Sequence, residues 1–173
     1  TDSGDAEGEV TATAAVNVKK EAIFEILPRF TGHIQQIPPM HSALKRDGRP
    51  LYELARKGIV VEREARAVTI YAIDLIDFTE DSLMLRVACS KGTYIRVLAA
   101  DIGAALGCGA HLSALRRTRV GDLELQGAVT LAELESLDEA GRLAHLQPVD
   151  ALLHTLPVLA VEGEAAQRFR HGN

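Results

Sequence analysis

AVTIYAIDLIDF (residues 67–78) and SLMLRVACS (residues 82–90) are the two stretches that decide the fold. In both, β-branched and other apolar residues alternate with polar or small ones, and only the polar tripeptide TED separates them. Two such runs joined by a short polar connection are typical of an antiparallel β-hairpin. The sequence therefore predicts a domain organised around antiparallel strands.

Helices are expected on both sides of this hairpin. Before it, Asn17 can cap a helix in which apolar residues between Ile23 and Phe30 recur with helical period. After it, residues 93–106 place their apolar side chains on one face, and Gly107 stands where a helix-ending glycine belongs. Hairpins and separate helices, rather than strand–helix–strand units, predict an α+β domain with a mainly antiparallel, mixed sheet and flanking helices.

The remaining segments give more local expectations. They are a strand at residues 9–14, a long loop at residues 32–47, a helix between Pro50 and Gly58, a short helix capped by Thr130, a strand beginning at Val158 and a polar helix over residues 165–173. The loop contains Pro38-Pro39 and shows no sustained period, and a loop of this length usually has a function.

The composition is that of an ordinary globular domain rather than of a membrane or disulfide-rich protein. Apolar residues make up 47% and charged residues 25% of the 173 residues. No apolar run reaches the roughly 18 residues of a membrane-spanning helix, and the polar start TDSGDAEGEV is unlike a signal peptide. Cys89 and Cys108 lie far apart, so we expect reduced thiols in a cytoplasmic protein without a membrane partner.

The charge is distributed unevenly along the chain. The net charge is −5, which argues against a nucleic-acid partner, but residues 29–66 carry eight Lys/Arg against four acids and residues 86–119 carry six against one. Phosphates respond to a local patch within about 8 Å in physiological salt rather than to the total charge. The two basic segments indicate a polyanionic partner, although scattered, solvated charge explains the same counts equally well.

The segment CSKGTYIR, residues 89–96, concentrates groups that can bind an anion. Gly92 allows a sharp turn and Thr93 can cap the following helix, so that Lys91 and the first free amide groups face an approaching anion. The alternative is a plain capped helix with exposed cations. The GxxxxGK[ST] pattern of nucleotide-binding loops is absent, which excludes a nucleotide-hydrolysing site of that kind.

Two further segments combine cations with turn-forming residues. In GCGAHLSALRRTRVG, the paired Arg116 and Arg117 are suited to bidentate phosphate binding. In the proline-containing stretch at residues 37–58, His41 and Lys45 could meet bases and phosphates, or the stretch could be an ordinary surface loop. The cysteine and histidine spacings match no standard zinc module, so no metal site is expected.

Four long motifs occur in a fixed order along the chain. They are TDSGDAEGEV, FTGHIQQIPPMHSALKRDGRPLYELARKG, RVACSKGTYIRVLAADIGAALGCGAHLSALRRTRVG and VTLAELESL. Together they resemble the TruB family of tRNA pseudouridine synthases over nearly all residues from 1 to about 153. The resemblance implies the pseudouridine-synthase fold with an RNA cleft. It also implies isomerisation of one uridine in the T-loop of tRNA, at position 55, with tRNA as the partner and without cofactor or metal.

The resemblance also implies roles for individual residues. Arg96 matches the arginine that pairs with the catalytic aspartate, Tyr94 matches an active-site aromatic beside the target nucleotide, and Leu115 matches an apolar residue lining the uracil pocket. A base must leave its stack to enter such a pocket. The residues that would bind the backbone phosphates and the T-stem-loop are His41, Lys45, Lys91, Arg116 and Arg117.

The sequence also departs from the family pattern. The family carries its nucleophilic aspartate in a Gly-Leu-Asp-Pro-type motif that these 173 residues do not contain. We therefore expect residues 1–153 to be the larger, C-terminal part of the catalytic domain, residues 154–173 to begin a C-terminal RNA-binding (PUA-like) domain, and this piece alone to be inactive. Two other functions stay open, a non-catalytic tRNA-binding or folding module and a guide-RNA-dependent synthase. The complete protein is expected to be a monomer.

Overall fold

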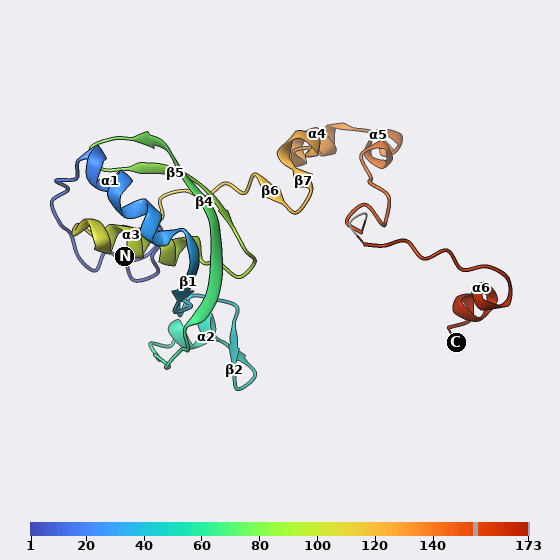
Figure 1. The fold of residues 1–173 in the computed structure, drawn as a ribbon, viewed down its shortest axis with the longest axis horizontal. Helices are drawn as coiled ribbons and strands as arrows, with labels where there is room; N and C mark the ends of the chain where they lie inside the picture. Colours follow the sequence, from blue (N-terminus) through green and yellow to red (C-terminus); the bar gives the residue numbers. More distant parts are fainter. Residues whose placement is uncertain (154–155, 173) are drawn as a thin grey trace. The chain divides into compact units, whose positions relative to one another are not determined.

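The hairpin predicted from the alternating runs is present in the computed structural model. β4 (Arg66–Phe78) and β5 (Leu83–Cys89) pair antiparallel, with Ile70 opposite Cys89. Two register shifts, one after Ile70 and one after Leu75, interrupt the pairing, and irregularities of this kind bend a strand. The bend is visible in Figure 1, where β4 is the long curved strand.

A third strand, β1 (Gly32–Gln36), pairs antiparallel with β4 and completes a sheet in the order β1-β4-β5. The prediction of one long loop over residues 32–47 was therefore wrong at its start. The two adjacent glutamines of GHIQQ conceal the alternation in the sequence, because Gln36 is buried whereas Gln35 is exposed. All pairings between the described strands are antiparallel, as expected.

The end of the same stretch forms a small hairpin rather than a loop. β2 (Lys45–Arg46) and β3 (Arg49–Pro50) pair around Asp47 and Gly48, whose φ angles of 50° and 79° close the tight turn. Glycine adopts positive φ freely, and aspartate is one of the few other residues that tolerate it. The helix α2 (Leu51–Ala55) follows directly, with Pro50 as its N-cap residue, as predicted.

Two helices lie side by side along the sheet (Figure 1). They are α1 (Lys20–Ile26), continued by the 3₁₀ turn η1 (Leu27–Phe30), and α3 (Ile95–Leu106). The core that they bury contains Ile23, Ile26, Leu27, Ile70, Leu98 and Ile102, and each such side chain contributes about 1.5–3 kcal/mol by leaving water. Gly107 ends α3 with a φ of 82°, as predicted, but α1 begins after Lys19 without a side-chain cap, so the cap proposed at Asn17 was wrong.

Two predicted strands do not form. Residues 9–14 adopt neither a strand nor a helix and are exposed along their whole length. Val158 and Leu159 also lie outside any strand, and they are 95% and 84% exposed. An alternating or β-branched run becomes a strand only when a partner strand and a buried face are available. Neither of these two segments has a partner strand or a buried face in the structure.

The structure describes residues 1–153 and 156–172, and its contacts divide the chain into two compact units, Thr1–Leu115 and Arg116–Asn173. The elements of the second unit are β6 (Arg119–Val120), β7 (Leu123–Glu124), η2 (Leu125–Gly127), α4 (Leu131–Ser136), α5 (Glu139–Ala144) and α6 (Gly163–Arg170). The helix α6 confirms the predicted polar helix, whose last residue lies outside the described part. The domain boundary expected after residue 153 falls where the description is interrupted, and it stays a prediction. None of the described helices is long and apolar enough to cross a membrane.

The short helix predicted behind Thr130 is α4, and a capping box begins it. The hydroxyl of Thr130 accepts the backbone N–H of Glu133 at 3.2 Å, and the carboxylate of Glu133 accepts the backbone N–H of Thr130 at 2.8 Å. The Thr130 hydroxyl also donates to this carboxylate at 2.7 Å. The bonds from the backbone and hydroxyl of Thr130 lower the pKa of Glu133 below its ordinary value.

The stability of α4 should therefore depend on pH through Glu133. Because the folded-state pKa is lowered, the box contributes fully above the ordinary glutamate pKa and loses its contribution as the pH falls through the lowered pKa. An NMR titration of the Glu133 carboxyl carbon checks this expectation. In the Thr130→Ala variant the pKa should return towards its ordinary value, and identical titrations of Glu133 in the two proteins would contradict the assignment.

Candidate functional site

The candidate site is built on the turn that leads from β5 into α3. The chain turns at Gly92 with a φ of 83°, and α3 then begins with Tyr94 as its N-cap residue. The prediction that Thr93 caps this helix was wrong, because its hydroxyl donates to the carbonyl of Ser90 at 2.9 Å and no side chain caps α3. Thr93 thus closes the turn, and Tyr94 and Arg96 occupy the start of the helix.

Gln36, the last residue of β1, holds the backbone of Tyr94 and was not identified from the sequence. Its side chain is 2% exposed. The side-chain oxygen Oε1 accepts the N–H of Tyr94 at 3.0 Å, and Nε2 donates to the carbonyl of Tyr94 at 3.3 Å. Both ends of the buried amide are therefore satisfied, as a buried polar group requires. The sequence gives only a weak indication of this role, because a glutamine can be assigned to the buried face of a strand only when the strand and its register are known.

Arg96 connects three segments of the first unit. Its half-buried guanidinium donates through Nη1 to the carbonyl of Ser3 at 3.3 Å and through Nη2 to the carbonyl of His41 at 2.6 Å. One side chain thus joins α3 to the N-terminal loop (residues 1–9) and to the proline loop (residues 37–44). Both acceptors are neutral carbonyl oxygens, so these bonds orient the guanidinium without neutralising its charge. An acid that approached this group would meet a cation already held in place.

The N-terminal loop is a closed turn held by its own hydrogen bonds. The N–H of Glu9 donates to the carboxylate of Asp2 at 2.9 Å, and the N–H of Asp2 donates to the carbonyl of Glu9 at 3.0 Å. The loop is docked on Leu112, whose N–H donates to the carbonyl of Gly4 at 3.0 Å. The docked loop presents the adjacent carbonyl of Ser3 to the arginine of α3.

Gly103, in the last turn of α3, sets the path by which the chain reaches Leu112. Its carbonyl accepts the N–H groups of Cys108 at 3.2 Å and Gly109 at 2.9 Å. A Cβ atom at Gly103 would lie 2.3 Å from the backbone nitrogen of Ala110, so only glycine permits so close an approach. The segment after α3 therefore folds back on the helix and reaches the N-terminal loop.

The proline loop is anchored along its length. Arg63 donates through Nη1 to the carbonyl of Pro38 at 3.2 Å, and the N–H of Tyr52 donates to the carbonyl of Ser42 at 3.1 Å. Pro38 and Ser42 are both buried. The loop thus has a defined path, and it presents the carbonyl of His41 to α3 from a fixed position.

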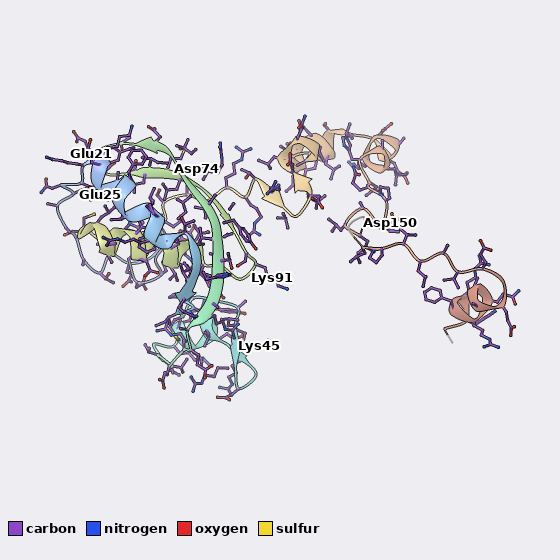
Figure 2. The ribbon with its side chains drawn as sticks, viewed as in Figure 1. Glu21, Glu25, Lys45, Asp74, Lys91 and Asp150 are labelled. Carbon is purple, nitrogen blue, oxygen red and sulfur yellow. The ribbon has the colours of Figure 1, made fainter. Side chains whose placement is uncertain are left out.

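Three of the eight residues predicted for the site gather at the start of α3. Tyr94 and Arg96 lie on the helix itself, and His41 contacts it through its carbonyl. Lys91 is exposed in the preceding turn and Lys45 is exposed in β2, and Figure 2 shows both side chains projecting from the surface of the first unit. These two lysines are therefore free to meet a ligand, but they are not part of the arginine cluster.

Of the remaining three predicted residues, one belongs to the first unit and two belong to the second. Leu115 is the last residue of the first unit and is 60% exposed. Arg116 and Arg117 open the second unit and are both exposed. The roles expected for Leu115 in the uracil pocket and for the two arginines in phosphate binding stay predictions.

Within the described residues, no group of three or more His, Cys, Asp or Glu side chains could hold a metal ion. Cys89 and Cys108 are half-buried free thiols. Partial burial raises the pKa of Asp101, an acid in the middle of α3, above the ordinary value of an aspartate.

Two family models match the chain in succession. The model of the N-terminal domain of the TruB family pseudouridylate synthases matches residues 1–95. The model of the C-terminal domain of tRNA pseudouridylate synthase B matches residues 96–154. The match covers every residue of the candidate site.

Curated relatives extend the match to the whole chain. The tRNA pseudouridine synthase B of Dechloromonas aromatica (strain RCB) is 74% identical over 173 residues, which are 100% of this chain and 58% of that protein. The protein of the same name from Ralstonia pickettii (strain 12J) is 56% identical over 99% of this chain and 55% of its own length. The chain therefore spans little more than half the length of these relatives.

A solved structure gives an independent match. A chain in the "Crystal Structure of a Cbf5-Nop10-Gar1 Complex" is similar with a TM-score of 0.61 and 31% sequence identity, over 79% of this chain and 39% of that chain. Together with the family models, this similarity confirms the α+β, pseudouridine-synthase fold expected from the sequence.

Proposed function

Because the chain belongs to the TruB family of pseudouridylate synthases, we propose that the complete protein converts the uridine at position 55, in the T-loop of tRNA, to pseudouridine. The observation that carries this proposal is the cluster at the start of α3, where two loop carbonyls orient a half-buried arginine beside an aromatic N-cap residue. A cation oriented by neutral groups suits a site that receives a catalytic carboxylate and a nucleobase.

In this proposal Arg96 is the charge partner of a nucleophilic aspartate from the Gly-Leu-Asp-Pro-type motif of the family. A guanidinium keeps its proton at any physiological pH, so Arg96 holds the carboxylate ionised rather than acting as an acid or a base. The aspartate attacks the nucleotide and the bond between N1 and C1′ breaks. The uracil then turns and C5 joins C1′, while the bond to the aspartate breaks and restores the free carboxylate. The C5 proton leaves to solvent and N1 takes one up. This isomerisation is redox-neutral, so the proposal requires neither cofactor nor metal.

The detached uracil must be confined until it has rejoined the sugar. Tyr94 and Leu115 form the walls of the proposed pocket, which the base enters after leaving its stack. The T-stem-loop is bound by four exposed cations and by one half-buried histidine. In this proposal those RNA-binding residues are His41, Lys45, Lys91, Arg116 and Arg117.

The catalytic domain would extend through residue 153, and residues 154–173 would begin a PUA-like RNA-binding domain. The complete protein would work as a cytoplasmic monomer that binds one tRNA. Sedimentation of the complete protein with tRNA would test this, since a monomer predicts a single complex with one protein molecule per tRNA.

A tritium-release assay tests the activity. The complete protein is incubated with tRNA carrying uridine tritiated at C5, and we expect one tritium to be released per tRNA without any guide RNA. A transcript with cytidine in place of the uridine at position 55 should release none. Salt-sensitive tRNA binding without tritium release would instead favour the non-catalytic tRNA-binding module, and release only with an added guide RNA would favour the guide-dependent kind.

A further inference from the structure

We propose that Gln36 is a positioning residue for this reaction, which fixes the ring of Tyr94 against the target uracil by holding the backbone of Tyr94. The inference rests on the proposed function. It is independent of the nucleophile, because it concerns two residues that contact each other within the first unit.

The hydrogen bonds of Gln36 fix both peptide groups that flank the Cα atom of Tyr94. The N–H of Tyr94 belongs to the preceding peptide group and donates to Oε1 of Gln36, whereas its carbonyl belongs to the following group and accepts from Nε2. With both groups held, the direction of the Cα–Cβ bond of Tyr94 is set. The ring can then turn only about its own side-chain bonds.

Tyr94 needs such an anchor because of its place in the chain. It is the N-cap residue of α3, with extended backbone angles of φ −94° and ψ 105°, and its N–H precedes the hydrogen bonds of the helix. Its carbonyl accepts the first helical bond, from the N–H of Leu98 at 3.1 Å. No side chain within the helix caps this position, so the partner of the Tyr94 N–H comes from another element.

The anchor itself is rigid. Gln36 lies opposite Arg66 at the end of β1, and every residue of this strand is paired with β4. The side chain is 2% exposed, so water does not compete for its hydrogen bonds. Pro38, which is also buried, follows two residues later and restricts the exit of the strand. Because Gln36 is fixed by the sheet and is hydrogen-bonded to Tyr94, it holds the start of α3 at a fixed position relative to the sheet.

The experiment is a double-mutant cycle in the complete protein, measured as single-turnover tritium release from tRNA at saturating protein. Gln36→Met keeps the length of the side chain and removes both hydrogen bonds, and Tyr94→Leu removes the ring. The matched control is Gln35→Met, which changes the same residue type one position earlier on the exposed face of the strand.

If the inference is correct, Gln36→Met slows the single-turnover rate about tenfold to a hundredfold, as misplacement of a contacting group does, with tRNA affinity within about twofold of wild type. Gln35→Met stays at the wild-type rate. In the Tyr94→Leu background the further effect of Gln36→Met disappears, because the group that Gln36 positions is gone. A role in stability alone would leave the two effects multiplicative, and that result would overturn the inference.

If Gln36→Met folds and reacts at the rate of the unmutated protein, the inference is overturned and the proposed function is left intact. If the unmutated protein is inactive on tRNA, both are overturned. If Gln36→Met does not fold, Gln36→Glu replaces it in the same cycle. At a pH where the introduced carboxyl group is ionised, this variant keeps the acceptor for the Tyr94 N–H and loses the donor to the carbonyl. A loss of rate that grows as the carboxyl group ionises, again abolished by Tyr94→Leu, is expected. If the effects of Gln36→Glu and Tyr94→Leu on the single-turnover rate multiply, or if Gln36→Glu leaves that rate unchanged, the inference is overturned.

Discussion

Replacing Arg96 with alanine in the complete protein should lower the single-turnover rate of pseudouridine formation by about a thousandfold while tRNA still binds. The magnitude is that expected when a pre-oriented charged donor is removed from an active site. The guanidinium is oriented by the carbonyls of Ser3 and His41 and not by RNA, so the loss should appear in the chemical step rather than in affinity. Single-turnover tritium release and filter binding of tRNA measure the two quantities separately.

The control for this experiment is Arg86→Ala, which removes an exposed arginine from β5 in the same unit. Its rate should stay close to that of the wild type. Arg96→Lys keeps the charge but cannot reach both carbonyls with a planar fork, so its rate should fall nearly as far as that of alanine. A single-turnover rate for Arg96→Ala equal to that of Arg86→Ala would remove Arg96 from the mechanism.

Gly103→Ala should destabilise the protein, although helix propensity predicts the opposite. Alanine in a helix interior is about 1 kcal/mol more favourable than glycine. Here the added Cβ would lie 2.3 Å from the backbone nitrogen of Ala110 and 2.3 Å from the carbonyl carbon of Gly109, so the segment after α3 must move. Overpacking of this kind costs about 1–3 kcal/mol, and we expect Tm to fall by several degrees.

The matched control is Ala104→Gly, one position further along α3, where the side chain is exposed. It should lower stability only by the intrinsic difference of about 1 kcal/mol. Because Gly103 directs the chain to Leu112 and the N-terminal loop, Gly103→Ala should also reduce activity. A Gly103→Ala protein that melts above the wild type would show that the segment after α3 does not pack on this glycine.

The elements that could be predicted are those whose signals are local. The central hairpin, the glycine that ends α3, and the cap at Thr130 each follow from a few neighbouring residues and were confirmed. β1 was missed because its partner, β4, lies about 30 residues away and its inward position at Gln36 is polar. Residues 9–14 have the alternation of a strand but form none, because a pattern alone does not show whether a partner strand exists.

The same distinction applies to the candidate site. The importance of Arg96 and Tyr94 was indicated by the motif around them, but the groups that hold them were not. Ser3, His41 and Gln36 are 93, 55 and 58 positions away from the residues that they contact. Two of these three partners act through backbone carbonyls, which every residue has, so no side-chain pattern could reveal them. Only the fold shows that both loops meet at the start of α3.

The central claim is that the first turn of α3 faces the uracil of tRNA. Photo-crosslinking tests it directly, with the complete protein bound to tRNA that carries 4-thiouridine at position 55. After digestion with trypsin, the crosslinked nucleotide should be found on the peptide of residues 92–96, GTYIR, which contains Tyr94. Crosslinks confined to residues 116–173, or to the exposed face of β4 and β5, would contradict the account.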